Sequence, residues 1–240
     1  MRFCVEGTFG AMITVSSLHD TRILKADFRE NLRGMHFLEQ SVLSAGMDVP
    51  APWGSEIQLS NILLLPASFI ELNTDGPGQR HLFIPVSGTM LFNSKTTHNQ
   101  PVSCEECISL ESHGRNITIQ NPYTEHNIQF LHFRFITKGN DRNRHSIRSI
   151  AGTRLNHFNT ISLTTGSLSI GVFTGRTKGV YPLKPASASA MVYVIHGAFE
   201  LEDRLLEQND ALLIWNKEKI EFEALSEHAI LLVFENKPIN

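Results

Sequence analysis

The 240-residue sequence predicts an all-β protein that contains two β-barrels in tandem. Its apolar residues come in short runs rich in Ile, Val, Leu and Phe, such as "NILLLPASFIEL" and "AILLVF", and turn residues separate the runs. Such runs are typical of strands in a sandwich or barrel. One pattern also occurs twice: "FIPVSGTMLF" at 83–92 and "VYVIHGAFEL" at 192–201 each place a Gly between two apolar strands. A duplicated unit of this kind predicts two similar β-domains.

The N-terminal segment, residues 1–55, is expected to pack on the barrels. Its stretch 18–40 carries the only helical character in the sequence, and that character is weak. Helices should therefore be short and lie there. Met12 is an alternative start of translation.

The two barrels are expected at residues 56–137 and 157–240. In each one the central Gly, Gly88 or Gly197, falls where a hairpin needs a positive φ angle or a close approach of the backbone. Residues 138–156 between them are polar and contain Gly, which indicates a linker.

Composition and charge restrict the classes of partner. A hydrophobic share of 41% and a charged share of 19% are typical of a globular protein. The formal net charge of −3 gives no reason to expect a nucleic acid partner. No apolar run approaches the roughly 18 residues of a membrane span, and the N-terminus lacks the apolar core of a signal peptide. We therefore expect a cytoplasmic protein that does not bind membranes.

Several side chains invite a metal interpretation. The stretch "LESHGRNITIQNPYTEHNIQFLHFRF" contains His113, Glu125, His126 and His132. The first three lie beside Gly or after Asn-Pro, so we expect exposed turn residues rather than ligands. The C-x-x-C in "SCEECISL" supplies only half of the four ligands of a structural zinc site, and two incidental cysteines are the favoured interpretation.

The two strand–Gly–strand units resemble a bicupin, and more closely the pirin family with its quercetin-dioxygenase-like bacterial members. The first half carries the resemblance in "VSGTML" and in "SLESHGRNITIQNPYTEHNIQFLHFRF". The second half carries it in "YPLKPASASAMVYVIHGAFELEDRLLEQNDALLIWNKEKIEFEALSEHAILLVF". Together they cover about residues 56–236. The resemblance implies two tandem jelly-roll β-barrels with few short helices, and a divalent metal held in the first barrel by three His and one Glu.

This chain departs from the family pattern at all four ligand positions. The resemblance places two His fourteen and twelve residues before the hairpin Gly, which are Thr74 and Gly76 here. It places the other His and the Glu just before Asn-Pro, where this sequence has Ile117 and Ile119. None of the four is a residue type that ordinarily holds such a metal, and an apolar lining disfavours an ion. We therefore expect no catalytic metal and no other cofactor.

The same four positions are expected to line a candidate pocket. Other apolar residues expected in its wall are Leu82, Ile84 and Phe133, although core packing is an alternative for them. Arg80 and His132 are the candidate polar residues. Counting from Thr74 puts Arg80 in the inward register and His81 outside it, and an inward Arg needs an anion. For His132 the outer face or the domain interface is an alternative.

These expectations favour a pirin-like bicupin without a catalytic metal, acting as a small-molecule-binding or protein-interaction module. The ligand would be small and either apolar or acidic. One alternative is a quercetin 2,3-dioxygenase-like oxidoreductase, which needs a metal. Another is a metal-free cupin isomerase, which needs an acid–base pair such as His81 with Asp75 or His196 with Tyr193.

Overall fold

The described part of the chain is built from β-strands and contains no α-helix, which confirms the predicted all-β class. The computed structural model describes residues 20–44, 47, 49, 53, 57–73, 78–95, 97–112, 116–136, 144–150, 154–163, 166–184 and 189–236. Within these ranges the one helical element is a 3-10 turn, η1 (Ala26–Phe28), so the weak helical character of 18–40 gives no α-helix. The described ranges also hold no helix with the length and apolarity to cross a membrane.

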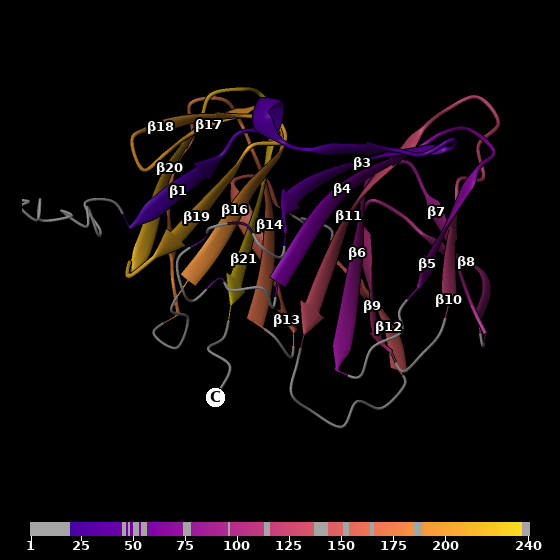
Figure 1. The fold of residues 1–240 in the computed structure, drawn as a ribbon. Coiled ribbons are helices and arrows are strands. Elements are labelled where there is room, and N and C mark those ends of the chain that lie inside the picture. The colour runs from indigo at the N-terminus through magenta and orange to yellow at the C-terminus, as the bar shows by residue number, and fades with distance from the viewer. Residues whose placement is uncertain are drawn as a thin grey trace, which may run out of the picture.

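Two sheets form the N-terminal barrel (Figure 1). The seven-stranded sheet has the order β12-β9-β6-β11-β4-β3-β2, and the four-stranded sheet has the order β5-β10-β7-β8. In chain order the strands are β2 (Asn31–Arg33), β3 (Phe37–Leu43), β4 (Ile57–Leu64), β5 (Phe69–Asn73), β6 (Gln79–Ser87), β7 (Met90–Ser94), β8 (Thr97–Val102), β9 (Glu106–Ser112), β10 (Asn116–Gln120), β11 (Ile128–Ile136) and β12 (Arg144–Ser149).

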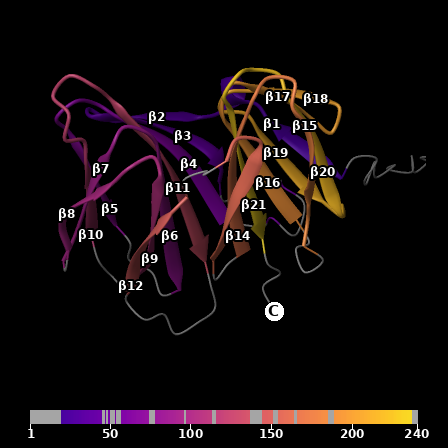
Figure 2. The ribbon, with the colours of Figure 1, turned by 180° about the vertical axis from the view of Figure 1, so that it is seen from behind.

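Two further sheets form the C-terminal barrel, which the reverse view also shows beside the first (Figure 2). The six-stranded sheet has the order β1-β19-β16-β21-β14-β13, and the four-stranded sheet has the order β15-β20-β17-β18. Their strands are β1 (Thr21–Leu24), β13 (His157–Leu163), β14 (Gly166–Phe173), β15 (Lys178–Pro182), β16 (Ser189–His196), β17 (Ala198–Leu201), β18 (Arg204–Glu207), β19 (Ala211–Trp215), β20 (Lys219–Ala224) and β21 (Ala229–Asn236).

Two of the expected segments outside the barrels contribute strands to the sheets. Strand β1 from the N-terminal segment pairs with β19 of the C-terminal barrel, while β2 and β3 join the N-terminal barrel. The N-terminal segment therefore supplies strands to both barrels. The stretch 138–156, expected to be a linker, contains β12, which pairs antiparallel with β9 at the edge of the N-terminal barrel. The division of the chain into domains stays a prediction.

Gly88 and Gly197 have the positive φ angles expected of them, 76° and 78°. They do not make hairpins, however. Strands β6 and β7 on either side of Gly88 belong to different sheets of one barrel, and so do β16 and β17 around Gly197. Each glycine therefore lies where the chain crosses from one sheet to the other.

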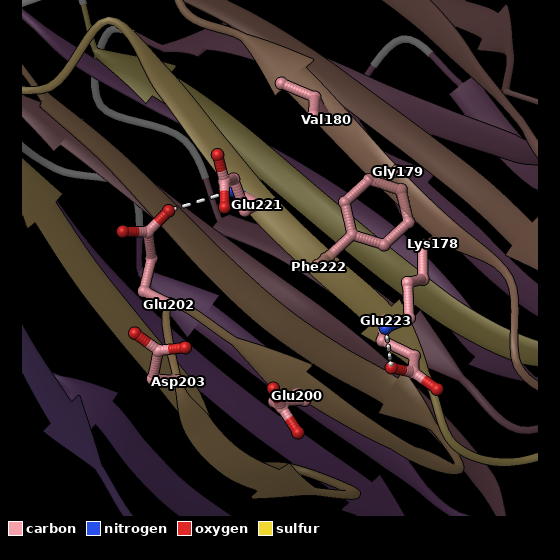
Figure 3. A pocket seen from close by; sticks show the side chains of 9 residues that line it. All are labelled: Lys178, Gly179, Val180, Glu200, Glu202, Asp203, Glu221, Phe222 and Glu223. Atoms are coloured by element: carbon pink, nitrogen blue, oxygen red, sulfur yellow. Dashed lines mark hydrogen bonds and ion pairs between the residues drawn. The ribbon is translucent and has the colours of Figure 1, made fainter.

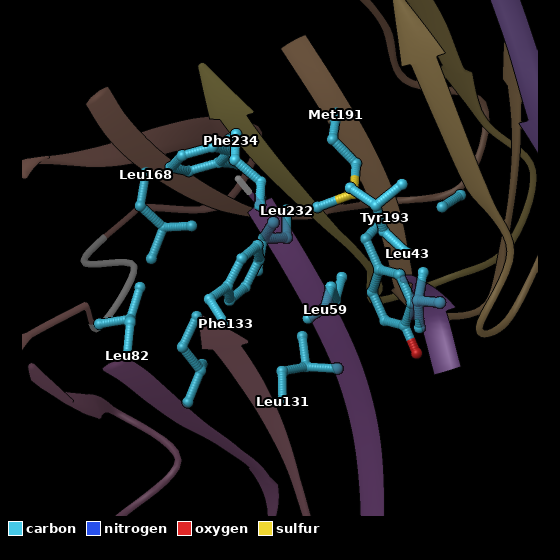
Figure 4. Close-up of a cluster of buried hydrophobic side chains, with 14 of the residues drawn as sticks. Leu43, Leu59, Leu82, Leu131, Phe133, Leu168, Met191, Tyr193, Leu232 and Phe234 are labelled. Atoms are coloured by element: carbon cyan, nitrogen blue, oxygen red, sulfur yellow. The ribbon is translucent and has the colours of Figure 1, made fainter. Parts of the chain in front are cut away.

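Three apolar cores follow from this arrangement. The N-terminal core lies inside the first barrel and the C-terminal core lies inside the second. The third, here called the interface core, joins the large sheets of both barrels (Figure 4). Strand β16 is buried along nearly its whole length because alternate side chains enter the C-terminal core and the interface core. This explains why "AMVYVI" is a continuous apolar run and not an alternating one.

Candidate functional site

The interior of the N-terminal barrel is lined by branched hydrocarbon from β10. Ile117 and Ile119 have no exposed surface and belong to the N-terminal core. Strand β10 sets their direction by pairing with β5 on one side and β7 on the other, so that Ile119 lies opposite Ile70 and Phe92. Thr74 and Gly76 lie outside the described residues.

The expected inward register of β6 is wrong by one residue. Leu82 and Ile84 belong to the interface core, whereas Phe83 belongs to the N-terminal core. Arg80 therefore lies on the face turned toward the other barrel, and His81 lies on the inner face. The prediction failed because it carried an alternation from Thr74 across Gly78, whose φ of 77° interrupts the strand path.

Strand β11 divides in the same way. Leu131, Phe133 and Phe135 enter the interface core, so the expectation that Phe133 lines the pocket is also wrong. Phe130 enters the N-terminal core, and His132 and Arg134 follow it on that face. Its register with β6 places His132 opposite Phe83 and Arg134 opposite His81. The inner wall thus brings His132 together with His81 and not with Arg80.

His81 and His132 form a stacked and hydrogen-bonded pair. Nδ1 of His81 lies 2.9 Å from Nε2 of His132, and the His132 ring stacks on Phe83 with centroids 4.4 Å apart. Burial, followed by the charge of Arg134, lowers the pKa of His81 to about 4. Burial, His81 and Arg134 hold the pKa of His132 well below its usual range. Both rings are therefore neutral at pH 7 and share one proton between the facing nitrogens.

Two polar groups of this wall, Nε2 of His81 and the guanidinium of Arg134, can each accept a further interaction with a ligand. His81 is 2% exposed, and within the described chain its buried Nε2 has no hydrogen-bond partner. Arg134 donates from Nη2 to Oε1 of Gln58, and in the same ranges it forms no ion pair with a carboxylate. A neutral imidazole and a guanidinium on an otherwise apolar wall suit a ligand with one acidic or hydrogen-bonding group.

The remaining metal candidates that the structure describes do not converge. Glu125 and His126 are exposed, as expected of turn residues, and His113 lies outside the described residues. Cys104 is exposed, while Cys107 is 1% exposed in the interface core, where burial raises the pKa of its thiol to about 12. Among the residues that the structure describes, no three His, Cys, Asp or Glu side chains come together as a metal site.

Asn121 of the Asn-Pro motif has a structural role. It has no exposed surface, and its Nδ2 donates to the carbonyl oxygens of Leu65 and His126 at 2.9 and 2.7 Å. Its Oδ1 accepts the backbone N–H of Tyr123 at 3.0 Å. The side chain thereby holds together the turn that carries the chain from β10 to β11.

Of the two acid–base pairs considered for an isomerase, the structure describes both members of His196 with Tyr193 only, and it does not bring them together. His196 is exposed at the end of β16, whereas Tyr193 is 1% exposed in the interface core and donates to Oδ1 of Asn209 at 3.0 Å. His81 has His132 as its partner, and Asp75 lies outside the described residues.

Sequence reasoning missed a polar cluster inside the C-terminal barrel. Oε1 of Glu235, a residue 1% exposed, accepts hydrogen bonds from Tyr181 at 2.7 Å and Ser167 at 3.1 Å. Its Oε2 accepts the backbone N–H of Lys184 at 2.9 Å. Burial raises the pKa of the Tyr181 phenol, so that group stays protonated. Both carboxylate oxygens are satisfied within the chain, and the cluster is therefore a closed structural network.

A shallow acidic hollow lies on the outer face of the C-terminal four-stranded sheet (Figure 3). Much of its charge is compensated by neighbouring cations: Lys178 pairs with Glu223 at 3.2 Å, and Lys217 pairs with Glu202. Despite the density of carboxylates, the described chain holds no cluster here that meets the needs of a metal ion. We interpret the hollow as a solvated surface.

The architecture is that of the bicupin fold, with two jelly-roll barrels in tandem. Residues 164–235 match the family model of the quercetinase C-terminal cupin domain. A sequence search among curated proteins finds no match.

Solved structures of pirins and quercetinases share the whole fold. Pirin YhhW of Escherichia coli is 12% identical, covers 90% of this chain and 98% of its own, and superposes with a TM-score of 0.73. A second YhhW structure, in complex with nickel(II), is 13% identical over 90% and 99% of the two chains with a TM-score of 0.74. Quercetin 2,3-dioxygenase of Acinetobacter baumannii is 14% identical over 92% and 80%, with a TM-score of 0.69. The chain therefore has a pirin-like bicupin fold.

Proposed function

We propose that this chain is a pirin-like bicupin that binds a small molecule in its N-terminal barrel without a catalytic metal. The observation that carries the proposal is hydrocarbon at Ile117 and Ile119, where the family resemblance expects a His and a Glu. A divalent ion between them would lose its ligands and would also meet a surface that cannot replace its water.

The donor set as a whole does not fit the metal that the fold implies. YhhW has been solved with nickel(II), so a metal is a reasonable expectation for such a barrel. Here Thr74 and Gly76 offer no imidazole, and Ile117 and Ile119 offer no donor at all. His81 and His132 supply two imidazoles that already bond to each other. A 2-His set without a carboxylate is short of the three or four protein ligands of such centres.

The inner wall instead supports recognition of an apolar molecule with one acidic group. Phe83, Ile117 and Ile119 supply apolar surface, and Arg134 supplies a positive charge with no carboxylate partner in the described ranges. The neutral His pair supplies a donor or acceptor at Nε2 of His81. A protein-interaction role would use outer surfaces and leave these inner groups without a purpose.

The test is metal analysis of protein purified without chelator, together with oxygen consumption on quercetin before and after addition of iron or nickel. We expect well below one equivalent of any transition metal and no turnover under either condition. One equivalent of tightly held metal, or metal-dependent turnover lost on chelation, would overturn the proposal in favour of a dioxygenase.

Ligand binding needs its own measurement. A panel of aromatic carboxylic acids titrated into the metal-free protein is expected to bind with an affinity that Arg134→Met lowers by about tenfold, as for the loss of a charge-assisted hydrogen bond. Lys95→Met is the matched control, because Lys95 is an exposed cation beyond the end of β7. Binding that is equally weak in all three proteins would contradict a role for the inner wall.

A further inference from the structure

A second cleft lies outside the N-terminal barrel, where the two barrels meet the N-terminal segment. Its volume is about 820 Å³, within the usual range for small-molecule sites. It is bordered by β1, by η1, by the end of β3 and by Leu205 of β18. Elements from both barrels and from the crossing N-terminal strand therefore build one concave surface.

The apolar part of this cleft has a buried floor and exposed edges. Leu24 is 8% exposed and Val42 is fully buried, so both form a fixed floor within the interface core. Phe28 is 89% exposed and Leu205 is 56% exposed, although both are large apolar side chains that line the cleft. Exposed apolar edges above a buried apolar floor favour a ligand with an apolar body.

The charged part is dominated by guanidinium groups. Lys25 is neutralised by Asp210, whose Oδ2 lies 2.6 Å from its Nζ. Arg22 and Arg29 have no carboxylate within ion-pair distance in the described chain. The one acidic residue in the lining is Glu30, which is exposed. Two guanidinium groups therefore face one solvated carboxylate.

Arg29 is the clearest sign of a built site. Its Nη1 donates to Oε1 of Gln40 at 3.2 Å and its Nη2 donates to the carbonyl oxygen of Leu24 at 2.7 Å. Its guanidinium lies over the Tyr193 ring at 5.9 Å, and burial lowers its pKa. Its Nε is buried without a partner among the described residues. The charge of Asp210 also acts on Arg29, but the Asp210 carboxylate already pairs with Lys25. A positioned cation whose counter-charge is shared in this way can stabilise a bound anion more than a fully solvated cation does.

We propose that this cleft binds a small organic anion, a carboxylate or sulfonate on an apolar aromatic or branched body. The acid group lies against Arg29 and Arg22, and the body covers Leu24 and Val42 between the edges Phe28 and Leu205. The site is independent of the N-terminal barrel interior, because the two share no residue.

The test compares three probes of one shape: 2-naphthoate, 2-naphthalenemethanol and 2-naphthylmethylammonium. Calorimetric titration of the full chain is expected to show that the anion binds about tenfold or more tightly than the neutral alcohol, as for a charge-assisted hydrogen bond. The cation should bind most weakly. Equal affinity for anion and alcohol would overturn the proposal.

A charge swap at an exposed edge residue locates the binding. Leu205→Glu should weaken naphthoate binding about fivefold and Leu205→Lys should strengthen it by a similar factor. Val180 is also 56% exposed but lies on β15 outside this cleft, so Val180→Glu should change nothing. Phe28→Ser should weaken binding about fivefold without altering the thermal midpoint, because Phe28 is almost fully exposed.

Binding at the barrel interior gives a different pattern. If Arg134→Met lowers the affinity for naphthoate and both Leu205 variants leave it unchanged, the ligand binds inside the N-terminal barrel. The cleft proposal would then be wrong, and the proposed function would stand. The reverse result would support the cleft and leave the barrel interior without this ligand.

Discussion

The His81–His132 pair makes the stability of the protein depend on pH. Both rings must stay neutral in the folded state because burial and Arg134 oppose their protonation. In the unfolded state each takes up a proton near its ordinary pKa of 6.5. The folded state therefore binds fewer protons below that pH, and acid shifts the equilibrium toward unfolding.

We expect His81 alone to remove about 3 kcal/mol from the free energy of unfolding as the pH falls from 6.5 to 4. This loss is complete below the folded pKa and absent above the unfolded one. Urea unfolding at several pH values should show a shallower profile in His81→Phe than in the parent protein. His126→Gln is the control, since His126 is exposed and its replacement should leave the profile unchanged. Parallel profiles for parent and His81→Phe would contradict the prediction.

Ile119 offers a direct test of whether the barrel interior accepts charge. Ile119 is fully buried among the apolar side chains of the N-terminal core, so Ile119→Glu would surround a carboxylate with hydrocarbon and should cost about 3 to 5 kcal/mol. Ile119→Met, which preserves an apolar side chain of similar volume, should cost under about 1.5 kcal/mol. Chemical denaturation of both variants provides the comparison. An Ile119→Glu variant as stable as Ile119→Met would mean that the interior is open and hydrated.

At the scale of elements, the two glycines where the chain crosses between sheets, Gly88 and Gly197, are the positions most sensitive to substitution. A Cβ at Gly88 would lie 2.8 Å from Cγ2 of Ile128, and a Cβ at Gly197 would lie 3.0 Å from Cβ of Ser226. Both residues also have positive φ angles, where Ala is strained. We expect Gly88→Ala and Gly197→Ala each to destabilise the protein by about 1 to 3 kcal/mol.

Gly175 provides the control for these substitutions. Its φ lies outside the positive range, and the nearest atom to an added Cβ is a carboxylate oxygen of Glu227 at 3.2 Å, at the end of a flexible side chain. Gly175→Ala should therefore change the free energy of unfolding by no more than about 0.5 kcal/mol. Equal losses at all three glycines, measured by urea denaturation, would rule out the positive-φ explanation.

The sequence predicted most strands and the duplicated architecture, but it could not place single side chains. Apolar runs such as those of β16 and β21 are recognisable because both faces are buried. Strand β12 was missed because its sequence, "RHSIRS", contains one apolar residue and edge strands need little burial. The predicted inward and outward directions of Arg80 and His81 were reversed because Gly78, with its positive φ, precedes the strand. The alternation of side chains cannot be extrapolated across such a break.

The cleft and the Glu235 cluster were beyond sequence reasoning for another reason. Leu205 reaches the N-terminal strand only because β1 joins the far barrel, a pairing across nearly the whole chain. Glu235 lies near the end of an apolar strand, where the sequence alone suggests a solvated carboxylate. In the structure, Ser167 of β14 and Tyr181 of β15 donate hydrogen bonds to it. Contacts of this range depend on topology, which local patterns do not encode.

At the scale of the molecule, the interface core makes the two barrels one unit. Phe133 of the first barrel and Phe234 of the second contact each other with ring centroids 5.5 Å apart, and both are fully buried. Each barrel alone would expose this apolar surface to water. We therefore expect a single cooperative transition in scanning calorimetry.

Phe133→Ala tests that coupling. The loss of a fully buried Phe should destabilise the protein by about 3 to 5 kcal/mol while a single transition is retained at a lower midpoint. Phe28→Ala, at an 89% exposed position, should leave the midpoint unchanged. Two separate transitions, of which Phe133→Ala moves only one, would show that the barrels unfold independently.

The pairing of strand β1 also affects how the chain folds during its synthesis. The ribosome synthesises residues 21–24 well before their partners, residues 211–214. At ordinary translation rates the interval is roughly 10 to 40 seconds. During this interval the N-terminal barrel can fold, whereas β1 remains an unpaired strand on the nascent chain. When two such chains emerge close together, β1 of one chain can pair with β19 of its neighbour as well as with its own, so we expect domain-swapped dimers among the misassembled products.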